Sequence, residues 1–274
     1  MKDVKKAVRS GYARIAKRQA SCCGPKSSCC DKSSEISEKI GYTKNDMASV
    51  PDGADLGLGC GNPIALASLK EGEIVLDLGS GAGFDCFLAA NKVGKIGKVI
   101  GVDMTPEMLE KARENAKNGG YSNVEFRLGE IEYLPVADNT VDVIISNCVI
   151  NLVPEKEKVF AEAFRVLKPG GRLMISDIVL LKELPEIIMS SVAAYVGCIS
   201  GAIIRDDYIK GIEKAGFQDV TIVEENLFSI DCMLNDPTAN AILENISLSV
   251  EKIKETAESI VSIRVSGVKK ESQK

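Results

Sequence analysis

The sequence predicts an α/β protein built on a doubly wound, mostly parallel β-sheet. From Glu73 onward, short apolar runs alternate with amphipathic segments of helical length. This alternation is typical of parallel strands joined by crossover helices. Two further observations agree with it. A glycine-rich turn follows the first apolar run, and the 45% hydrophobic content of the 274 residues is enough to fill a sizeable core.

The strands and helices can be placed in order along this region. Buried strands are expected at residues 73–79, 98–104, 123–129, 141–147 and 171–178, and a last strand at the end of the segment 208–225. Helices are expected at residues 84–93, 105–120 and 154–171, and at the start of the segment 208–225. In the second helix, Thr105 is the expected N-cap, Pro106 occupies the first turn and two glycines end the helix.

The segments on either side of this region differ from it in composition. Residues 1–60 begin with a basic helix expected at about 4–17, followed at 21–34 by a Ser-, Gly- and Cys-rich stretch that is expected to be a mobile loop. Residues 231–274 are expected to form a helix from about Asp236 to Ser262 and a frayed basic tail. We therefore expect an N-terminal arm or cap at 1–60, a main domain at 61–230 and a C-terminal helical extension at 231–274.

Charge and hydropathy exclude several classes of partner. The formal net charge is −5, so no basic field is present to attract nucleic acid or an anionic membrane. No run of about 18 apolar residues occurs, and the basic N-terminal segment lacks the apolar core of a signal peptide. We therefore expect a cytoplasmic protein that acts on a small molecule and binds neither nucleic acid nor membrane.

The chain combines nine cysteines with no histidine. In a reducing compartment these cysteines would be thiols available for metal, redox or catalytic chemistry. Imidazole is the most frequent general base in enzymes. Any chemistry of this chain must therefore use thiols, carboxylates or a reactive cofactor.

A glycine-rich loop, DLGSGAGFD at Asp77–Asp85, lies between the first strand and the first helix. Glycines there allow the backbone to pass close to a ligand. Asp103 ends the second strand, where a carboxylate can bind two ribose hydroxyls. Phe84 stands where the dinucleotide-binding fingerprint requires a third glycine. The loop resembles instead that of class I S-adenosylmethionine methyltransferases, whose cofactor carries no phosphate.

This resemblance implies where S-adenosylmethionine would bind. Asp77 would lie near the methionine amino group, Asp103 would hold the ribose, and Glu130 with Ile131 would contact the adenine. The string LKPGG before the fifth strand is also typical of these enzymes. The implied cofactor-binding residues are Asp77, Gly79, Gly81, Gly83, Asp103, Met104, Glu130, Ile131 and Asn147.

Cys148 follows Asn147 at the end of the fourth strand, and from this position alone it could equally be a packing residue. The wider sequence favours a function. The strings GLGCGNP, LGSGAGFDC, FRLGEIEYLPV, SNCVINL and GCISGA, in this order, closely resemble the arsenite S-adenosylmethionine methyltransferases over about Tyr12 to Glu224. Carried over from that family, the arsenic-binding cysteines would be Cys60, Cys148 and Cys198, the last in an insertion near 184–205.

The chemistry of trivalent arsenic agrees with these residue types. Arsenic(III) is soft and prefers thiolates to oxygen ligands. Its lone pair can attack the cofactor's methyl group without loss of a proton, so no histidine is required. The resemblance therefore implies an enzyme of arsenic detoxification that methylates arsenite and methylarsenite, and a thiol reductant such as glutathione or thioredoxin that restores its thiols.

The remaining cysteines have several possible roles. Cys86 is expected to pack in the first helix, and Cys232 could be either structural or functional. Four N-terminal cysteines resemble those of microbial family members and are expected to form a flexible arm that delivers arsenic or exchanges disulfides with the pocket; a zinc knot is the less favoured interpretation. These accessory thiols are Cys22, Cys23, Cys29 and Cys30.

Two functions of other classes remain open. One is another small-molecule methyltransferase that acts on carbon or oxygen, in which the three mapped cysteines would have no role. The other is a thiol-rich, metalloid-binding protein without turnover, against which the intact glycine-rich loop and Asp103 argue.

Overall fold

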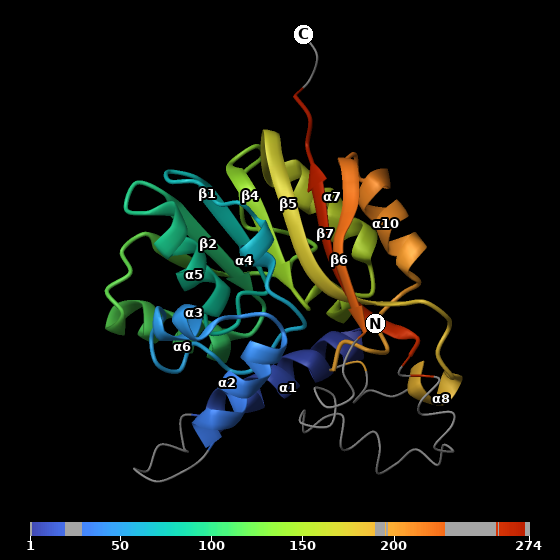
Figure 1. Ribbon diagram of the computed structural model, residues 1–274, viewed down its shortest axis with the longest axis horizontal. Helices are drawn as coiled ribbons and strands as arrows, with labels where there is room; N and C mark the ends of the chain where they lie inside the picture. The colour runs from blue at the N-terminus through green and yellow to red at the C-terminus, as the bar shows by residue number, and fades with distance from the viewer. Residues whose placement is uncertain are drawn as a thin grey trace.

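A seven-stranded sheet with the order β3-β2-β1-β4-β5-β7-β6 lies at the centre of the molecule (Figure 1). The structure is a computed structural model that describes residues 2–19, 29–189, 195, 197–227, 256 and 258–271. Strands β1 to β5 pair in parallel, and β7 is antiparallel to both of its neighbours. The strands are β1 (Ile74–Leu78), β2 (Lys98–Asp103), β3 (Val124–Leu128), β4 (Val141–Asn147), β5 (Leu167–Leu180), β6 (Gln218–Leu227) and β7 (Ile260–Val268).

Helices cover both faces of the sheet. Because successive strand residues point to opposite faces, β1 contributes Leu76 and Leu78 to one buried cluster and Val75 to the other. The first cluster includes residues of α7 (Lys156–Val166) and α10 (Arg205–Lys214). The second includes residues of α4 (Pro63–Leu66), α5 (Phe84–Val93) and α6 (Pro106–Asn118). The sheet therefore separates two cores, as the doubly wound prediction requires.

The predicted elements from β1 to β4 are confirmed. Helix α5 and strand β4 have the predicted bounds, and α6 begins at Pro106 and is followed by Gly119. Two other elements differ. Helix α7 ends at Val166, earlier than expected, because Leu167 is already extended and pairs with Val141. As a result β5 is longer than predicted.

The C-terminal region differs from the prediction at residues 260–268, where a strand takes the place of the end of the predicted helix and the residues after it. Residues Ile260–Val268 form β7, which inserts between β5 and β6. This segment is rich in Ile and Val, and most of its side chains are buried, which suits a strand covered on both faces. Lys269 is also fixed, because its Nζ donates to the carbonyls of Phe164 and Leu167, each at 2.7 Å. The rest of the predicted helix, up to residue 255, lies outside the described residues, as does Cys232.

The N-terminal segments lie at the carboxyl ends of the parallel strands (Figure 1). Helix α1 (Lys2–Gln19) confirms the predicted basic helix. Helix α2 (Cys29–Lys39) corrects the predicted loop over 29–34. Ile36 and Ile40 follow at helical spacing, and Ile40 is buried in the core beside α5, which explains why this stretch is helical. Cys22 and Cys23 lie outside the described residues.

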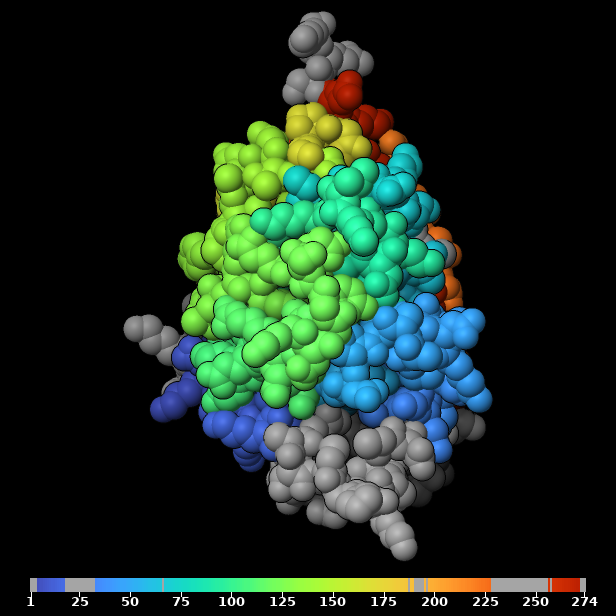
Figure 2. Space-filling view, turned by 90° about the vertical axis from the view of Figure 1, so that its left-hand side faces the viewer, coloured from blue at the N-terminus to red at the C-terminus, as the bar shows by residue number. Residues whose placement is uncertain are grey.

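Three short helices complete the described chain: α3 (Lys44–Ala48), η1 (Ile150–Leu152) and α8 (Glu186–Met189). In Figure 2 the blue N-terminal segments and the green part of the main domain form one continuous surface. None of the described helices has the length and apolar character needed to cross a membrane.

Candidate active site

A cavity of about 360 Å³ lies at the carboxyl ends of the parallel strands. Its walls include Gly79–Ala82 after β1, Asp103–Thr105 after β2 and Asn147–Val149 after β4. Helix α1 contributes the facing wall through Lys5, Val8, Tyr12 and Ile15. Ligands of open α/β sheets bind at this edge. The cavity is therefore the candidate active site.

The glycine-rich turn after β1 forms one wall of this cavity. Gly79 has φ +71°, and a Cβ at this position would lie 2.5 Å from the side chain of Val149. Its N–H donates to the carbonyl of Val102 at 2.8 Å, which holds the turn against β2. A Cβ on Gly81 would have no described atom within 4 Å, so the turn is open on that side.

Gly83, also predicted to bind the cofactor, lies in a tightly packed part of the turn. It is absent from the cavity wall and occupies the N-cap of α5 with φ +94°. A Cβ there would lie 2.8 Å from the rings of Phe87 and Phe126. Aromatic packing beneath the turn therefore accounts for this glycine.

Asp103 is held by backbone N–H groups at the entrance to the cavity. Its two carboxylate oxygens accept hydrogen bonds from the N–H groups of Gly81, at 2.9 Å, and Thr105, at 2.8 Å. Burial raises the pKa of the Asp103 carboxyl, and these N–H groups oppose that rise. Asp103 therefore presents a carboxylate of fixed orientation on the cavity wall.

Two further carboxyl groups, those of Asp77 and Asp85, line the cavity. Asp77 is 3% exposed, and the thiol of Cys86 donates to its Oδ2 at 3.2 Å. Burial and the neighbouring Asp85 raise the pKa of Asp77 well above its ordinary value. A cationic group entering the cavity would favour the ionised forms of these carboxyls. Cys86 is fully buried in the core, as predicted for a packing residue.

The segment after β3 contacts α1. Lys5 pairs with Glu130 at 2.7 Å and with the buried Glu132, and Ile131 between them lines the cavity. The sequence prediction identified Glu130, Ile131 and the basic helix, but it did not place Lys5 or this helix at the cavity. The signal was present, because Val4, Val8, Tyr12 and Ile15 recur at the spacing of one helical face.

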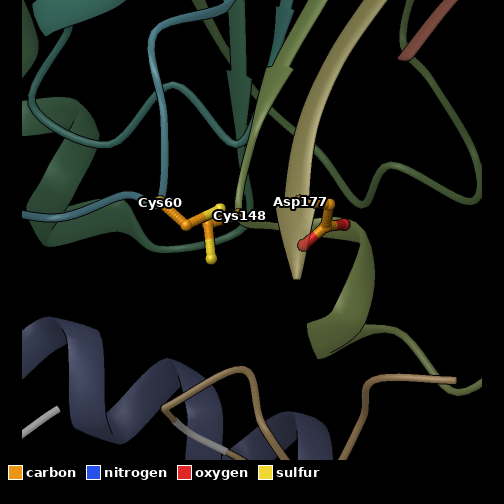
Figure 3. A group of neighbouring side chains, drawn as sticks. All are labelled: Cys60, Cys148 and Asp177. Atoms are coloured by element: carbon orange, nitrogen blue, oxygen red, sulfur yellow. The ribbon is translucent and has the colours of Figure 1, made fainter. Parts of the chain in front are cut away.

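Three thiols lie at the other end of the cavity, and Figure 3 shows two of them, Cys60 and Cys148, together with Asp177. The ligand atoms of Cys60, Cys148 and Asp177 lie within 4.8 Å of one another, and the thiol of Cys198 donates to the carbonyl of Cys148 at 2.9 Å. Cys60 and Cys198 are buried and Cys148 is partly exposed. Cys148 and Cys198 line the cavity, whereas Cys60 is not part of its wall. The chain thus brings together the three cysteines that the sequence singled out.

The backbone at two of these cysteines is strained. Cys148 has φ +56° and Cys198 has φ +64°, in the left-handed region that residues with a side chain rarely adopt. Such conformations cost about 1 to 3 kcal/mol each and are concentrated at functional sites, where the surroundings enforce them. The N–H of Cys148 donates to the carbonyl of Ser176 at 2.8 Å, which extends the β4–β5 pairing and fixes this turn.

Comparison with known proteins assigns the chain to a family. A sequence model described as "Methyltransferase domain" matches residues 69–227. The arsenic(III) S-adenosylmethionine methyltransferase of Chlamydomonas reinhardtii superposes with a TM-score of 0.64 at 34% identity, covering 87% of this chain and 75% of that one. This chain belongs to the arsenic(III) S-adenosylmethionine methyltransferase family.

Curated members of the family are similar over most of this chain. The arsenite methyltransferase of Halobacterium salinarum is 52% identical over 233 residues, which cover 82% of this chain and 60% of the relative. The human arsenite methyltransferase is 34% identical over 238 residues, which cover 83% of this chain and 62% of the relative. The chain therefore spans about three fifths of the length of these curated relatives.

In this member of the family the surroundings of Cys60 and Cys148 favour the neutral form of both thiols. Hydrogen bonding to Cys198 and Cys60 raises the pKa of Cys148 well above its ordinary value, with burial adding to the effect. Burial raises the pKa of Cys60. A thiophilic substrate would therefore have to replace the thiol protons as it binds.

Asp177 is a residue of this site that the sequence analysis missed. It is fully buried at the carboxyl end of β5 and faces the thiols of Cys60 and Cys148 (Figure 3). Its carboxylate accepts from the Asn151 amide, the Ile178 N–H and the Tyr208 hydroxyl, each at 2.9 Å. Burial raises its pKa to about 6. The available signal was an acidic residue inside the mostly apolar run LMISDIVL.

Proposed function

We propose that this protein transfers methyl groups from S-adenosylmethionine to thiolate-bound trivalent arsenic, converting arsenite and methylarsenite into methylated arsenicals. One observation carries the proposal. Cys60, Cys148 and Cys198 come from three distant parts of the chain and meet beside a methyltransferase-type glycine-rich turn. A methyltransferase for carbon or oxygen acceptors would have no use for such a thiol cluster.

The residues at the first end of the cavity fit S-adenosylmethionine. Buried Asp77 suits the cationic methionine amino group, and the Asp103 carboxylate, fixed on the cavity wall, suits the ribose hydroxyls. The buried hydroxyl of Ser80, which also lines the cavity, has no hydrogen-bond partner among the described residues. When bound, the cofactor would supply an electrophilic methyl group on sulfur.

The neutral thiols suit arsenite as substrate. When an As–S bond forms, an arsenic hydroxyl leaves as water with the proton of the attacking thiol. Three such exchanges bind arsenite and two bind methylarsenite, and no general base is consumed. Cys148 and Cys198 would hold both substrates, and Cys60 would be the third ligand to arsenite. The protein then positions the arsenic lone pair toward the methyl group and excludes water from the cavity.

Methyl transfer uses the lone pair and so oxidises arsenic. We therefore propose that a thiol reductant, glutathione or a thioredoxin-type protein, is a co-substrate of the reaction. We also propose that this detoxification takes place in the reducing cytoplasm. Cys29 and Cys30 occupy the first turn of α2, close in sequence to Cys22 and Cys23. The role of these four thiols as an arsenic-delivering or disulfide-exchanging arm stays a prediction.

A single reaction tests the proposed function. Purified protein is incubated with arsenite, glutathione and methyl-labelled S-adenosylmethionine, and the arsenic species are separated by liquid chromatography with elemental detection. We expect labelled methylarsenicals in amounts equal to the S-adenosylhomocysteine formed. Cofactor turnover on a quinol or phenol with no methylated arsenic would assign the chain to a different acceptor.

A further inference from the structure

The side-chain amide of Asn147 holds both sides of the loop that carries Cys60. Its Oδ1 accepts a hydrogen bond from the Cys60 N–H at 3.1 Å, and its Nδ2 donates to the Gly61 carbonyl at 2.8 Å. The loop passes very close to this amide, because a Cβ on Gly59, at φ +121°, would lie 2.8 Å from Asn147 Nδ2. Asn147 directly precedes Cys148. The amide therefore fixes the backbone of Cys60 relative to Cys148.

Two buried residues determine which way this amide faces. Because one N–H of Asn147 Nδ2 is used by the Gly61 carbonyl, the other is shared between the Tyr42 hydroxyl at 2.9 Å and Asp85 Oδ2 at 3.2 Å. The Tyr42 hydroxyl in turn donates to Asp85 Oδ1 at 2.6 Å. An ionised carboxylate only accepts hydrogen bonds, so Asn147 must present its NH₂ group to Asp85. A reversed amide would place its oxygen against the carboxylate and against the Gly61 carbonyl, and would leave buried polar groups unpaired.

The geometry of this cluster, which we call the Asn147 clamp (Asn147, Asp85 and Tyr42), leaves little freedom. Tyr42 is 4% exposed and Asp85 is 7% exposed, and the Tyr42 ring packs edge-on against Phe84 with centroids 4.8 Å apart. Burial, together with the charge of Asp85, raises the pKa of Tyr42 well above its ordinary value, so its hydroxyl keeps the proton that it donates. Each clamp residue is therefore held in one orientation.

Tyr42 lies outside the cavity wall, whereas Asp85 and Asn147 are part of it. The Tyr42 hydroxyl can therefore reach the substrate thiols only through its two partners. This separation distinguishes a positioning residue from one that contacts the cofactor or the arsenic.

We propose that the Asn147 clamp positions Cys60 for use as the third arsenic ligand and thereby determines how well arsenite is accepted relative to methylarsenite. The inference rests on the proposed function, since it assigns Cys60 to arsenite alone. Methylarsenite offers two sites for thiolates, which Cys148 and Cys198 occupy. A displaced Cys60 loop should therefore impair the first substrate far more than the second.

The variant Tyr42→Phe tests the clamp with the loss of one oxygen atom. We expect kcat with arsenite to fall by about tenfold or more, because misplacement by a fraction of an ångström is costly in a positioned reaction, and kcat with methylarsenite to change much less. Tyr121→Phe is the matched control. Its hydroxyl also makes one hydrogen bond, to the Ser49 carbonyl at 3.0 Å, but remote from the thiols. The control should leave the ratio of the two rates unchanged.

A second measurement needs neither arsenic nor cofactor. The intact proteins are treated with iodoacetamide, and alkylation of Cys60 and Cys198 is followed by peptide mass spectrometry. We expect Cys60 to react several times faster in Tyr42→Phe than in the unaltered protein, with Cys198 unchanged. If Tyr42→Phe does not fold, Asn147→Asp serves the same test, since it keeps the acceptor for Cys60 and removes the NH₂ group.

The outcomes separate the inference from the function on which it rests. Equal losses with both substrates, or Cys60 alkylation that is the same in the variant and the unaltered protein, would overturn the positioning role. Failure of the unaltered protein to methylate either arsenical would overturn the proposed function. In that case faster Cys60 alkylation in the variant would still support the clamp, and unchanged alkylation would refute it.

Discussion

The two ends of the cavity are built in different ways. At the cofactor end, backbone N–H groups from the turns after β1 and β2 hold Asp103, so the structure depends on local chain geometry. At the thiol end, three cysteines come from distant segments; the partly buried Asn147 amide holds the backbone of Cys60, and buried Asp177 lies beside the thiols of Cys60 and Cys148. Single substitutions should therefore separate cofactor binding from substrate capture, with the thiol end the more sensitive of the two.

The largest expected effect is the loss of Cys148 or Cys198. Cys148→Ser and Cys198→Ser should each abolish methylation of both arsenite and methylarsenite, because a hydroxyl is a poor ligand for soft arsenic. Affinity for S-adenosylmethionine, measured by calorimetry, should stay within about twofold of the unaltered protein if the two ends are independent. Full arsenite turnover by Cys148→Ser would refute the assignment of the thiol end.

Replacement of Cys60 should affect the turnover of arsenite and of methylarsenite differently. Cys60→Ser should lower arsenite turnover by more than about tenfold and spare methylarsenite, because only arsenite requires a third thiolate. Initial rates of each reaction, followed by chromatography of arsenic species, provide the measurement. Equal losses with both substrates would show that Cys60 acts at a step common to them.

Asp103→Ala probes the cofactor end in isolation. The variant loses the acceptor for two ribose hydroxyls, and each charge-assisted hydrogen bond is worth about 1.5 to 3 kcal/mol, so the Kd for S-adenosylmethionine should rise at least about tenfold. Arsenite bound per protein, measured after gel filtration, should be unchanged. An unaltered Kd would mean that the ribose binds elsewhere.

The smallest effect concerns stability and pH. The pKa of Asp177 is raised from 3.8 to about 6, so the folded protein binds more protons than the unfolded chain between about pH 4 and pH 6. The contribution of this residue to the free energy of unfolding is therefore present at pH 4 and lost as the pH rises through 6, by at most about 3 kcal/mol. Asp177→Asn should show a flatter dependence in urea unfolding over this range. Parallel curves for the two proteins would contradict the buried, protonated carboxyl.

Sequence patterns were sufficient to predict those elements whose conformation depends on residues within the same segment. Strands β1 to β4 and helix α5 follow from short apolar runs, helical spacing and glycine turns that lie within each segment. The position of Asp103 at a strand end also follows from the pattern. Strand β7 does not, because its conformation depends on pairing with β5 and β6, which lie far from it in the chain.

The thiol end could be predicted only in part, because it too depends on contacts between residues that are far apart in the chain. Cys60 and Cys198 were identified from a family resemblance, since nothing in their own segments places them beside Cys148. Tyr42 and Asp177 escaped notice because their roles depend on hydrogen bonds to residues 43 and 31 positions away. Long-range contacts of buried side chains leave no periodic signal in a sequence.

The insertion of β7 also affects how this protein is made. The hydroxyl of Ser262 on β7 donates to the carbonyl of Cys60 at 2.6 Å, and β6 has no strand neighbour other than β7 among the described residues. During translation, β6 emerges from the ribosome well before β7, so it waits unpaired beside an open edge of β5. Unpaired strand edges in nascent chains attract chaperones and promote aggregation. The loop that carries Cys60 therefore gains this hydrogen bond only when synthesis has passed residue 262, so we expect the thiol end of the cavity to be completed late.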